Sequence, residues 1–349
     1  MSNRPNAYFP GTEPLADDEM RLTALGTGMP RPRASQASSS WLLELGNGDN
    51  FLFDLGTGSF VNLCQTELLH ADLNKLFLSH LHVDHMADFM AWLLAGWSER
   101  FSESGIEVWG PSGQTPELGT AHFIEHVIAA SQWDIASRRG KVPEEGLECT
   151  VHEFDYRGEN QIVYERDGVV VRSWPAVHAI DGAVSYSLEW QGLKFVYGGD
   201  TVPNRWFLEY AQDADVVIHE CFPSADVMEK RMGFPRPHAE MIANKMHTPP
   251  HLFGQVMAQL NPRLAIATHF LNEPSTAPAV IRDISARYNG TFALAKDLMV
   301  WNISAESIHQ RLLVNSADTW PVVSNSKSGT RGKITPLSDF LKEAIVTFE

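Results

Sequence analysis

The sequence is poor in cysteine and has no long apolar run. Its 349 residues include only Cys64, Cys149 and Cys221, which are too few and too scattered for a disulfide framework. The first twenty residues hold no apolar stretch like that of a secretory signal, and no later run is long enough to cross a bilayer. We therefore expect a soluble, cytoplasmic protein with no membrane association.

Basic residues are also scarce. Lysine and arginine number 27 against 43 aspartate and glutamate residues, so the formal net charge is −16. The stretch 144–167 is especially acidic, and we expect it to form a solvated β-hairpin. Proteins that hold nucleic acid rely on basic surface to neutralise phosphates. The charge therefore disfavours nucleic acid as a partner and favours a small-molecule substrate.

The chain does contain enough apolar residues, 44%, to fill a large core. A single large α/β domain accommodates this length. We expect a polar N-terminal arm over 1–19, the domain itself over 20–314, and a polar linker with a short C-terminal helix over 315–349. The amphipathic end of the chain is expected to dock on the body or on a second subunit, and we expect a homo-oligomer, a dimer or larger.

The most informative stretch is 78–90, which reads LSHLHVDHMADFM. It lies between an expected strand, 73–78, and an expected helix, 86–98. Alternate residues at a strand end point the same way, so His80 and His82 can reach one metal ion together. Asp84 and His85 lie on the following turn and can face a second ion. Imidazole and carboxylate are ligands that zinc accepts.

Later strands also end in potential ligands. Sites in α/β sheets form beyond the ends of strands, so these scattered residues are expected to converge. Asp54, at the end of an earlier buried strand, either orients a ligand histidine or simply caps the strand. The later strand-end residues are His178, Asp200, His219, Glu220 and His269, and His247 falls in an expected helical segment, 238–260.

Two further groups of residues admit two interpretations. His122 and His126 have the i, i+4 spacing of zinc ligands, but the acid of an HExxH motif is missing, which favours an exposed helix face within 116–139. Five aromatic residues either line an apolar pocket near the strand ends or belong to the core. They are Trp92, Trp97, Trp174, Trp206 and Phe222.

The series HxHxDH, a lone histidine, GGD and a late THF resembles the metallo-β-lactamase superfamily of di-metal hydrolases, over roughly residues 20–302. LGTGMP, FDLGTG, IHEC and the pair His247-Thr248 resemble its RNase Z branch. VWGPSG, VHEFDYR, VYGGDT and MVWNI are similar to β-lactamases of RNase Z ancestry.

This resemblance implies an αββα sandwich with two zinc ions, or another divalent metal such as Mn²⁺ or Fe²⁺, at the edge between two sheets. It implies one ion held by His80, His82 and His178, a second held by Asp84, His85 and His269, and Asp200 shared by both. It also implies catalytic roles for three residues, of which one accepts a hydrogen bond from the nucleophile and two assist proton transfer and bind the oxyanion. These are Asp84, Glu220 and His247.

From these features we expect a di-zinc hydrolase in which a metal-bridging hydroxide opens a small-molecule amide or ester, with β-lactam ring opening as the best specific candidate. The alternative is an RNase Z-like phosphodiesterase that processes tRNA 3′ ends, which the acidic charge and the missing basic arm disfavour. A metal-binding protein without turnover is the third hypothesis, and it would leave Glu220 and His247 without a task.

Overall fold

Alternating side chains give the central strands two buried faces. In β3 (Ser40–Leu45) and β4 (Asn50–Phe53), Trp41 and Phe53 belong to one apolar cluster, whereas Leu42 and Leu52 belong to another. Successive residues of a strand point to opposite faces, so this sheet is covered on both sides. The computed structural model describes residues 4–68, 71–100, 105–315, 330 and 332–346.

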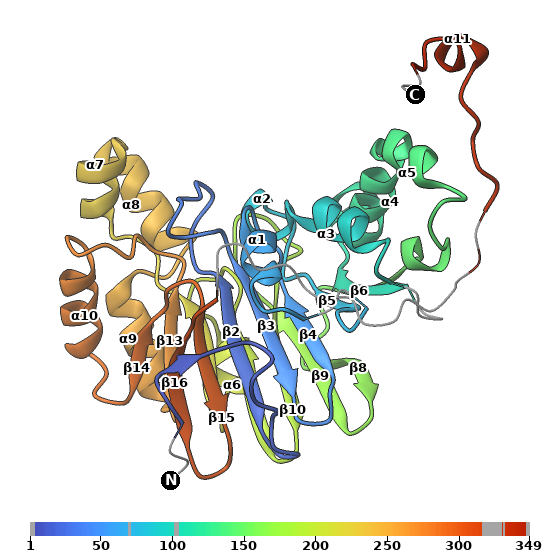
Figure 1. Ribbon diagram of the computed structural model, residues 1–349. Helices are drawn as coiled ribbons and strands as arrows, with labels where there is room; N and C mark the ends of the chain where they lie inside the picture. The colour runs from blue at the N-terminus through green and yellow to red at the C-terminus, as the bar shows by residue number, and fades with distance from the viewer. Residues whose placement is uncertain (1–3, 69–70, 101–104, 316–329, 331, 347–349) are drawn as a thin grey trace.

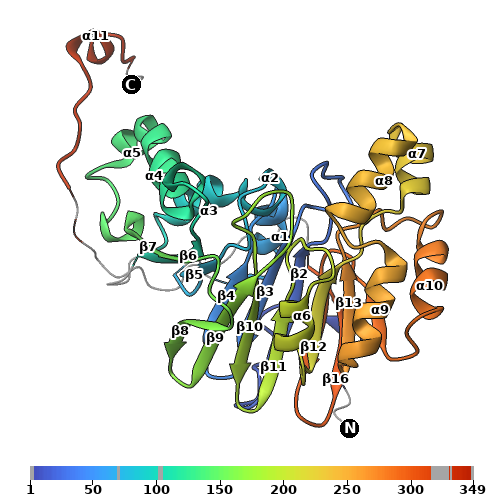
Figure 2. The same ribbon diagram turned by 180° about the vertical axis from the view of Figure 1, so that it is seen from behind.

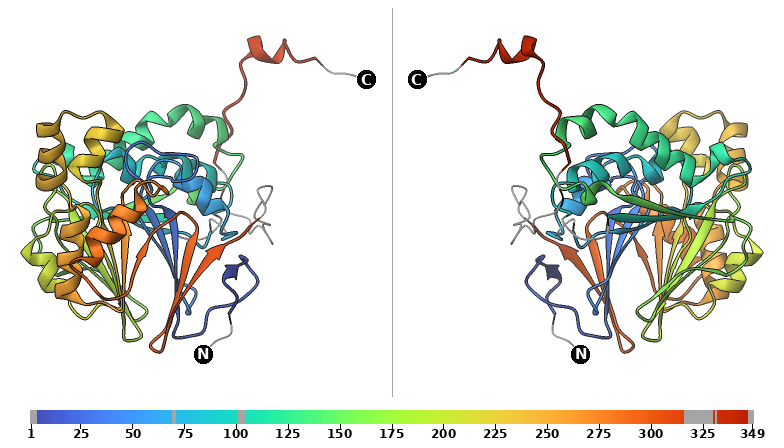
Figure 3. Two further views of the ribbon diagram at one scale, coloured as in Figure 1. Left: turned by 90° about the vertical axis from the view of Figure 1, so that its left-hand side faces the viewer. Right: turned by 90° about the vertical axis from the view of Figure 1, so that its right-hand side faces the viewer.

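Two sheets stack face to face, as the edge-on views of Figure 3 show. The first has the strand order β1–β16–β15–β2–β3–β4–β5–β6–β7, and the second has the order β14–β13–β12–β11–β10–β9–β8. The remaining strands of the first sheet are β1 (Ala7–Tyr8), β2 (Met20–Gly26), β5 (Lys75–Phe77), β6 (Ile106–Pro111), β7 (Cys149–Phe154), β15 (Met299–Ile303) and β16 (Ile308–Leu313). The second sheet consists of β8 (Gln161–Arg166), β9 (Val169–Pro175), β10 (Val184–Trp190), β11 (Leu193–Tyr197), β12 (Val216–Glu220), β13 (Leu264–Thr268) and β14 (Phe292–Leu294).

Helices cover the outer face of each sheet, so the fold is the expected αββα sandwich (Figures 1 and 2). The first sheet carries α1 (Ser59–Cys64), α2 (Val83–Met86), α3 (Phe89–Gly96), α4 (Thr120–Ala130) and α5 (Gln132–Arg138), with 3-10 turns at Pro116–Leu118 and Glu145–Leu147. The second carries α6 (Arg205–Tyr210), α9 (Pro250–Leu260) and α10 (Ala277–Ser285). A helical hairpin of α7 (Ala225–Met232) and α8 (Arg236–Lys245) stands beyond the strand ends, and α11 (Asp339–Lys342) lies away from the body (Figure 1).

Parallel strands bring the ends of distant segments to one edge of the sandwich. Strands β4, β5, β6 and β7 run parallel in the first sheet, and β11, β12, β13 and β14 run parallel in the second. The carboxyl ends of parallel strands meet at the same edge, which is where a site forms in such sheets.

The N-terminal arm is attached to the first sheet. Strand β1 pairs with β16, and Tyr8 is buried. The Tyr8 hydroxyl accepts a hydrogen bond from Arg21 at 2.8 Å, while Arg311 is paired with Glu13. The arm therefore adds an edge strand to the sheet.

Two expectations about secondary structure are wrong. The stretch 144–167 is not a hairpin, because β7 pairs with β6 in the first sheet whereas β8 pairs with β9 in the second. The expected helix 238–260 is interrupted at 246–249, between α8 and α9. Proline cannot donate a backbone hydrogen bond, so Pro249 and Pro250 begin a new helix instead of continuing the old one.

Most of the expected linker, residues 316–329 and 331, lies outside the described residues. Among the residues that are described, every helix is too short or too polar to span a membrane.

Phe53 occupies the centre of the core between the sheets. Its ring is stacked on Phe77 at 5.4 Å and contacts Phe195 at 5.2 Å. We expect Phe53→Ala to lower the free energy of unfolding by about 3–5 kcal/mol, because it removes a buried ring and leaves a cavity. Urea denaturation followed by circular dichroism measures this change.

Trp133→Ala on α5 is the control for that measurement. The Trp133 side chain is 84% exposed, so its removal should change the free energy of unfolding by less than about 0.5 kcal/mol. Equal losses for the two variants would contradict the assignment of Phe53 to the core.

Candidate metal centre

Each residue of the expected ligand set lies where a strand ends or where the next helix begins. His80 and His82 follow β5, and Asp84 and His85 lie on α2. The other three follow β9, β11 and β13; they are His178, Asp200 and His269. The structure brings all seven together in two adjoining groups: His80, His82, His178 and Asp200 in one, and Asp84, His85, Asp200 and His269 in the other.

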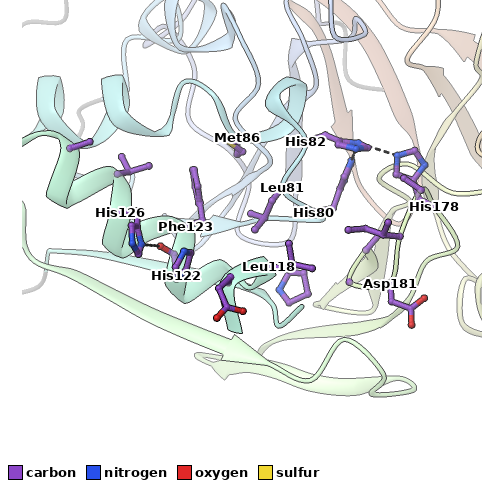
Figure 4. Close-up of a pocket in the computed structure, with 18 residues that line it drawn as sticks. His80, Leu81, His82, Met86, Leu118, His122, Phe123, His126, His178 and Asp181 are labelled. Atoms are coloured by element: carbon purple, nitrogen blue, oxygen red, sulfur yellow. Dashed lines mark hydrogen bonds between the residues drawn. The ribbon is translucent and has the colours of Figure 1, made fainter. Parts of the chain in front are cut away.

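Three imidazole nitrogens converge in the first group. His82 Nδ1 lies 3.0 Å from His80 Nε2 and 3.1 Å from His178 Nε2 (Figure 4). His178 Nδ1 donates to the carbonyl oxygen of Met246 at 2.8 Å, so a neutral His178 has its lone pair on Nε2.

Ser79 sets the tautomer of His80 in the same way. The Ser79 hydroxyl donates to Asp54 at 2.7 Å, so it can only accept from His80 Nδ1, which lies 3.0 Å away. A neutral His80 therefore has its lone pair on Nε2. Burial is the main cause that holds the pKa of His80 well below its ordinary value, and that favours the neutral ring.

The second group combines buried carboxylates with imidazoles. His269 Nε2 lies 3.0 Å from Asp84 Oδ2 and 3.4 Å from Asp200 Oδ2. His85 Nε2 lies 3.4 Å from Asp200 Oδ1. Burial opposes the charge of Asp200, but His269 and His85 outweigh burial and hold the pKa of this carboxyl well below its ordinary value. Asp200 is thus ionised, and it lies between the two groups.

The donor set fits divalent metal ions. At most one of the two close contacts to His82 Nδ1 can be a hydrogen bond, because His80 and His178 both present a lone pair to it. His85 Nε2 is buried and has no hydrogen-bond partner among the described residues. A cation resolves both conflicts, since imidazole nitrogen and carboxylate oxygen are ligands of zinc and related ions.

Asp54 ties the ligand segments together beneath this site. Its buried carboxylate accepts hydrogen bonds from the backbone N–H and hydroxyl of Ser79, both at 2.7 Å, and from the Tyr197 hydroxyl at 2.6 Å. It also accepts a hydrogen bond from His85 Nδ1 at 2.6 Å, and His85 Nε2 then faces Asp200. Of the two sequence-based interpretations, the structure favours orientation of a ligand histidine.

Two glycines allow the ligand segments to approach each other. A Cβ on Gly56 would lie 2.0 Å from the carbonyl oxygen of Asp84, so any side chain there would displace α2. Gly199 has a φ of +59°, and a Cβ on it would lie 2.8 Å from the Cβ of Ser79. Gly56 of FDLGTG is therefore required by close contact with the backbone of α2, and Gly199 of VYGGDT by its positive φ and its contact with Ser79.

Glu220 and His247 form a pair beside the two groups. Glu220 Oε2 accepts from His247 Nδ1 at 2.9 Å, and Glu220 Oε1 accepts from the backbone N–H of Thr201 at 2.7 Å. The ring of Phe222 is stacked on His247 with 3.7 Å between centroids. Burial disfavours a charged His247, but Glu220 outweighs it and raises the pKa of His247 above its ordinary value. The break between α8 and α9 places His247 here.

Other candidate residues lie elsewhere. His219 points away from the site, where its ring contacts Phe207 at 4.7 Å in the core under α6. His122 and His126 lie on α4, outside both groups. Of the five aromatic residues, Trp92, Trp97 and Trp174 are fully buried, Trp206 packs against the core of the second sheet, and only Phe222 contacts the site.

Sequence analysis missed Ser79 and Tyr197, which support the ligands through Asp54. Ser79 directly precedes His80, and its position next to a ligand was a usable signal. Tyr197 ends β11 on the opposite sheet, and no local pattern connects it to Asp54.

Comparison with known proteins agrees with this geometry. Residues 35–219 match the family model described as the metallo-beta-lactamase superfamily. Ribonuclease Z from Mycobacterium marinum (strain ATCC BAA-535 / M) is 30% identical over 203 residues, which cover 57% of this chain and 70% of that protein. Ribonuclease Z from Mycobacterium sp. (strain KMS) is 28% identical over 272 residues, which cover 77% of this chain and 89% of that protein.

Solved structures share the fold. The metallo-beta-lactamase fold protein YhfI from Bacillus subtilis has a TM-score of 0.63 at 17% identity, covering 82% of this chain and all of that one. The short form of human tRNase Z has a TM-score of 0.60 at 20% identity, covering 80% of this chain and 98% of that one.

The fold and the site define a metal-dependent hydrolase. The chain belongs to the metallo-β-lactamase superfamily and is similar to its RNase Z branch.

The comparisons overturn our first functional choice. Hydrolysis of a small-molecule amide or ester, with β-lactam ring opening as the specific candidate, is not what the relatives indicate, because they are named Ribonuclease Z. The preference for a small-molecule substrate over nucleic acid is wrong for the same reason. Net charge describes the whole surface and says little about one local groove.

Asp54→Asn should weaken divalent-metal binding about 10–100-fold, because an amide cannot accept all four hydrogen bonds, which come from Ser79, His85 and Tyr197. Competition with a chromophoric chelator measures the affinity. The control is Asp167→Asn, since Asp167 is exposed and shares a positive φ, 51° against 57° for Asp54. Equal affinities in a folded Asp54→Asn protein and the wild type would contradict the orienting role.

Proposed function

We propose that this chain is an RNase Z-like phosphodiesterase that binds two zinc ions and removes the 3′ extension of a tRNA precursor. In this proposal His80, His82 and His178 hold one ion, and Asp84, His85 and His269 hold the other. Asp200, which belongs to both groups, is shared. The Ribonuclease Z relatives support the substrate class.

The paired ions, when bound, lower the pKa of a shared water and offset the negative charge that develops on the phosphoryl oxygens. The protein supplies the remaining functions. Asp84 Oδ2 faces His269, which leaves the second carboxylate oxygen of Asp84 to accept a proton from the attacking water. Asp84 is buried, so its position is fixed before substrate arrives.

The proposal rests mainly on the hydrogen bond between Glu220 and His247 beside the metal groups. Glu220 is fully buried and is held by Thr201, so it fixes the ring of His247 through Nδ1. His247 Nδ1 lies 3.8 Å from Asp200 Oδ2, which places the ring at the side of the metal groups. A protonated His247 can then donate from Nε2 to a phosphoryl oxygen or to the leaving oxygen.

The direct test is cleavage of a 3′-extended tRNA precursor by zinc-loaded protein, with nitrocefin as the comparison substrate. We expect site-specific removal of the extension and two zinc ions per chain by elemental analysis. Asp200→Ala and His82→Ala should abolish cleavage and lower the zinc content. A protein that holds two zinc ions and leaves the precursor intact would refute the proposed reaction.

His247→Ala should lower kcat for the precursor by about 10²–10⁴-fold, the usual contribution of a positioned proton donor. Its zinc content should stay at the wild-type level, because His247 is assigned to neither ion. His251→Ala is the matched control, since His251 is exposed on α9, four residues further along the chain. An undiminished kcat in His247→Ala would remove His247 from the reaction.

A further inference from the structure

A pocket of about 550 Å³ opens beside the metal centre, between α4 and the loop after β9. His80, His82 and His178 form one end of the pocket, and His122 and His126 on α4 form the other (Figure 4). Small-molecule sites of known proteins have volumes of about 300–1,000 Å³. The chemistry proposed above uses only the three histidines at the metal end of this pocket.

The walls of the pocket are mostly apolar. Leu81, Phe123 and Leu118 lie between the two sets of histidines (Figure 4). Leu118 and Ile180 are 45% and 61% exposed, so folding leaves apolar surface in contact with water. Such a concave apolar surface next to a reaction centre is typical of a binding site.

Charge restricts what the pocket can hold. Among the described residues that line it, the only formally charged side chains other than histidine are Glu117 and Asp181. Both are exposed and acidic, so they repel a phosphate. Asp181 Oδ2 accepts from the Tyr156 hydroxyl at 3.2 Å, and its other oxygen remains able to accept a further N–H.

The two histidines on α4 present flat faces and an acceptor. Their ring centroids are 3.9 Å apart with an interplanar angle of 31°. His126 Nδ1 donates to the carbonyl oxygen of His122 at 2.8 Å, so a neutral His126 has its lone pair on Nε2. Histidine and phenylalanine rings are surfaces on which nucleobases stack.

We propose that this pocket is the subsite for a nucleobase next to the scissile phosphate, and that it prefers bases with an exocyclic amino group over uracil. The inference rests on the proposed phosphodiesterase function. The phosphate lies at the metal centre, and the neutral ring lies between α4 and the loop after β9. The acceptors on Glu117, Asp181 and His126 select amino groups, which adenine, cytosine and guanine carry and uracil lacks.

Nucleosides without a phosphate test the pocket separately from the metal ions. We expect adenosine to bind the zinc-loaded and the metal-free protein alike, as measured by isothermal titration calorimetry, and uridine to bind at least several-fold more weakly. Leu118→Glu should weaken adenosine binding about tenfold, because it replaces apolar contact surface with a charged side chain. Leu118 is exposed enough for this variant to fold.

A second pair of variants provides a matched control. Ala130→Trp introduces a bulky side chain into the pocket, whereas Ala129 is exposed on the same helix and does not line it. We expect Ala130→Trp to raise KM for the tRNA precursor about tenfold with kcat within about twofold, because only binding is changed. Ala129→Trp should match the wild type.

The outcomes separate the two proposals. If the protein cleaves the precursor but does not bind adenosine, the base subsite alone is overturned. The same conclusion follows if the Ala130→Trp and Ala129→Trp proteins cleave it with equal KM values. Equal affinities for adenosine and uridine would overturn the preference for amino groups. If adenosine binds and Leu118→Glu weakens its binding, but the protein does not cleave the precursor, the phosphodiesterase function is overturned instead.

Discussion

One buried carboxylate, that of Asp54, holds the site together. It lies at the end of β4 with a positive φ, and it accepts hydrogen bonds from the segment that carries His80, from His85 on α2 and from Tyr197 on the opposite sheet. A charge taken out of water is stable only when its oxygens are fully hydrogen-bonded, and Asp54 meets that condition with four donors. A single side chain therefore connects the ligand segments of the first sheet to Tyr197 on the second.

The site above Asp54 is different, because some of its buried polar atoms lack a matching partner among the described residues. Lone pairs of His80 and His178 face His82, while Asp84 and Asp200 are buried side by side. Folding places these groups together at a cost, and bound cations offset that cost. The folded protein therefore holds the ligand groups in position in advance, and the reacting groups are in place before substrate arrives.

The proposed substrate is bound by surfaces of different kinds. The metal groups and the Glu220–His247 pair are suited to a phosphate, whereas the pocket under α4 is apolar and acidic and is suited to a neutral ring. The net charge of −16 led the sequence analysis away from nucleic acid, because it averages over the whole surface. Recognition of one phosphate and one base requires only a small region of the right character.

The sequence by itself determined the donor types and the strand-end position of the ligands. Strand pattern and ligand chemistry are local properties, so His80, His82, Asp84 and His85 could be read from one short stretch. Only the tertiary structure decided that His219 points into the core although it is the neighbour of Glu220, and that most of the tryptophans are core residues. These outcomes depend on which face of a strand or helix is covered by a distant part of the chain, and that is settled by packing between the two sheets and their helices, not by neighbouring residues.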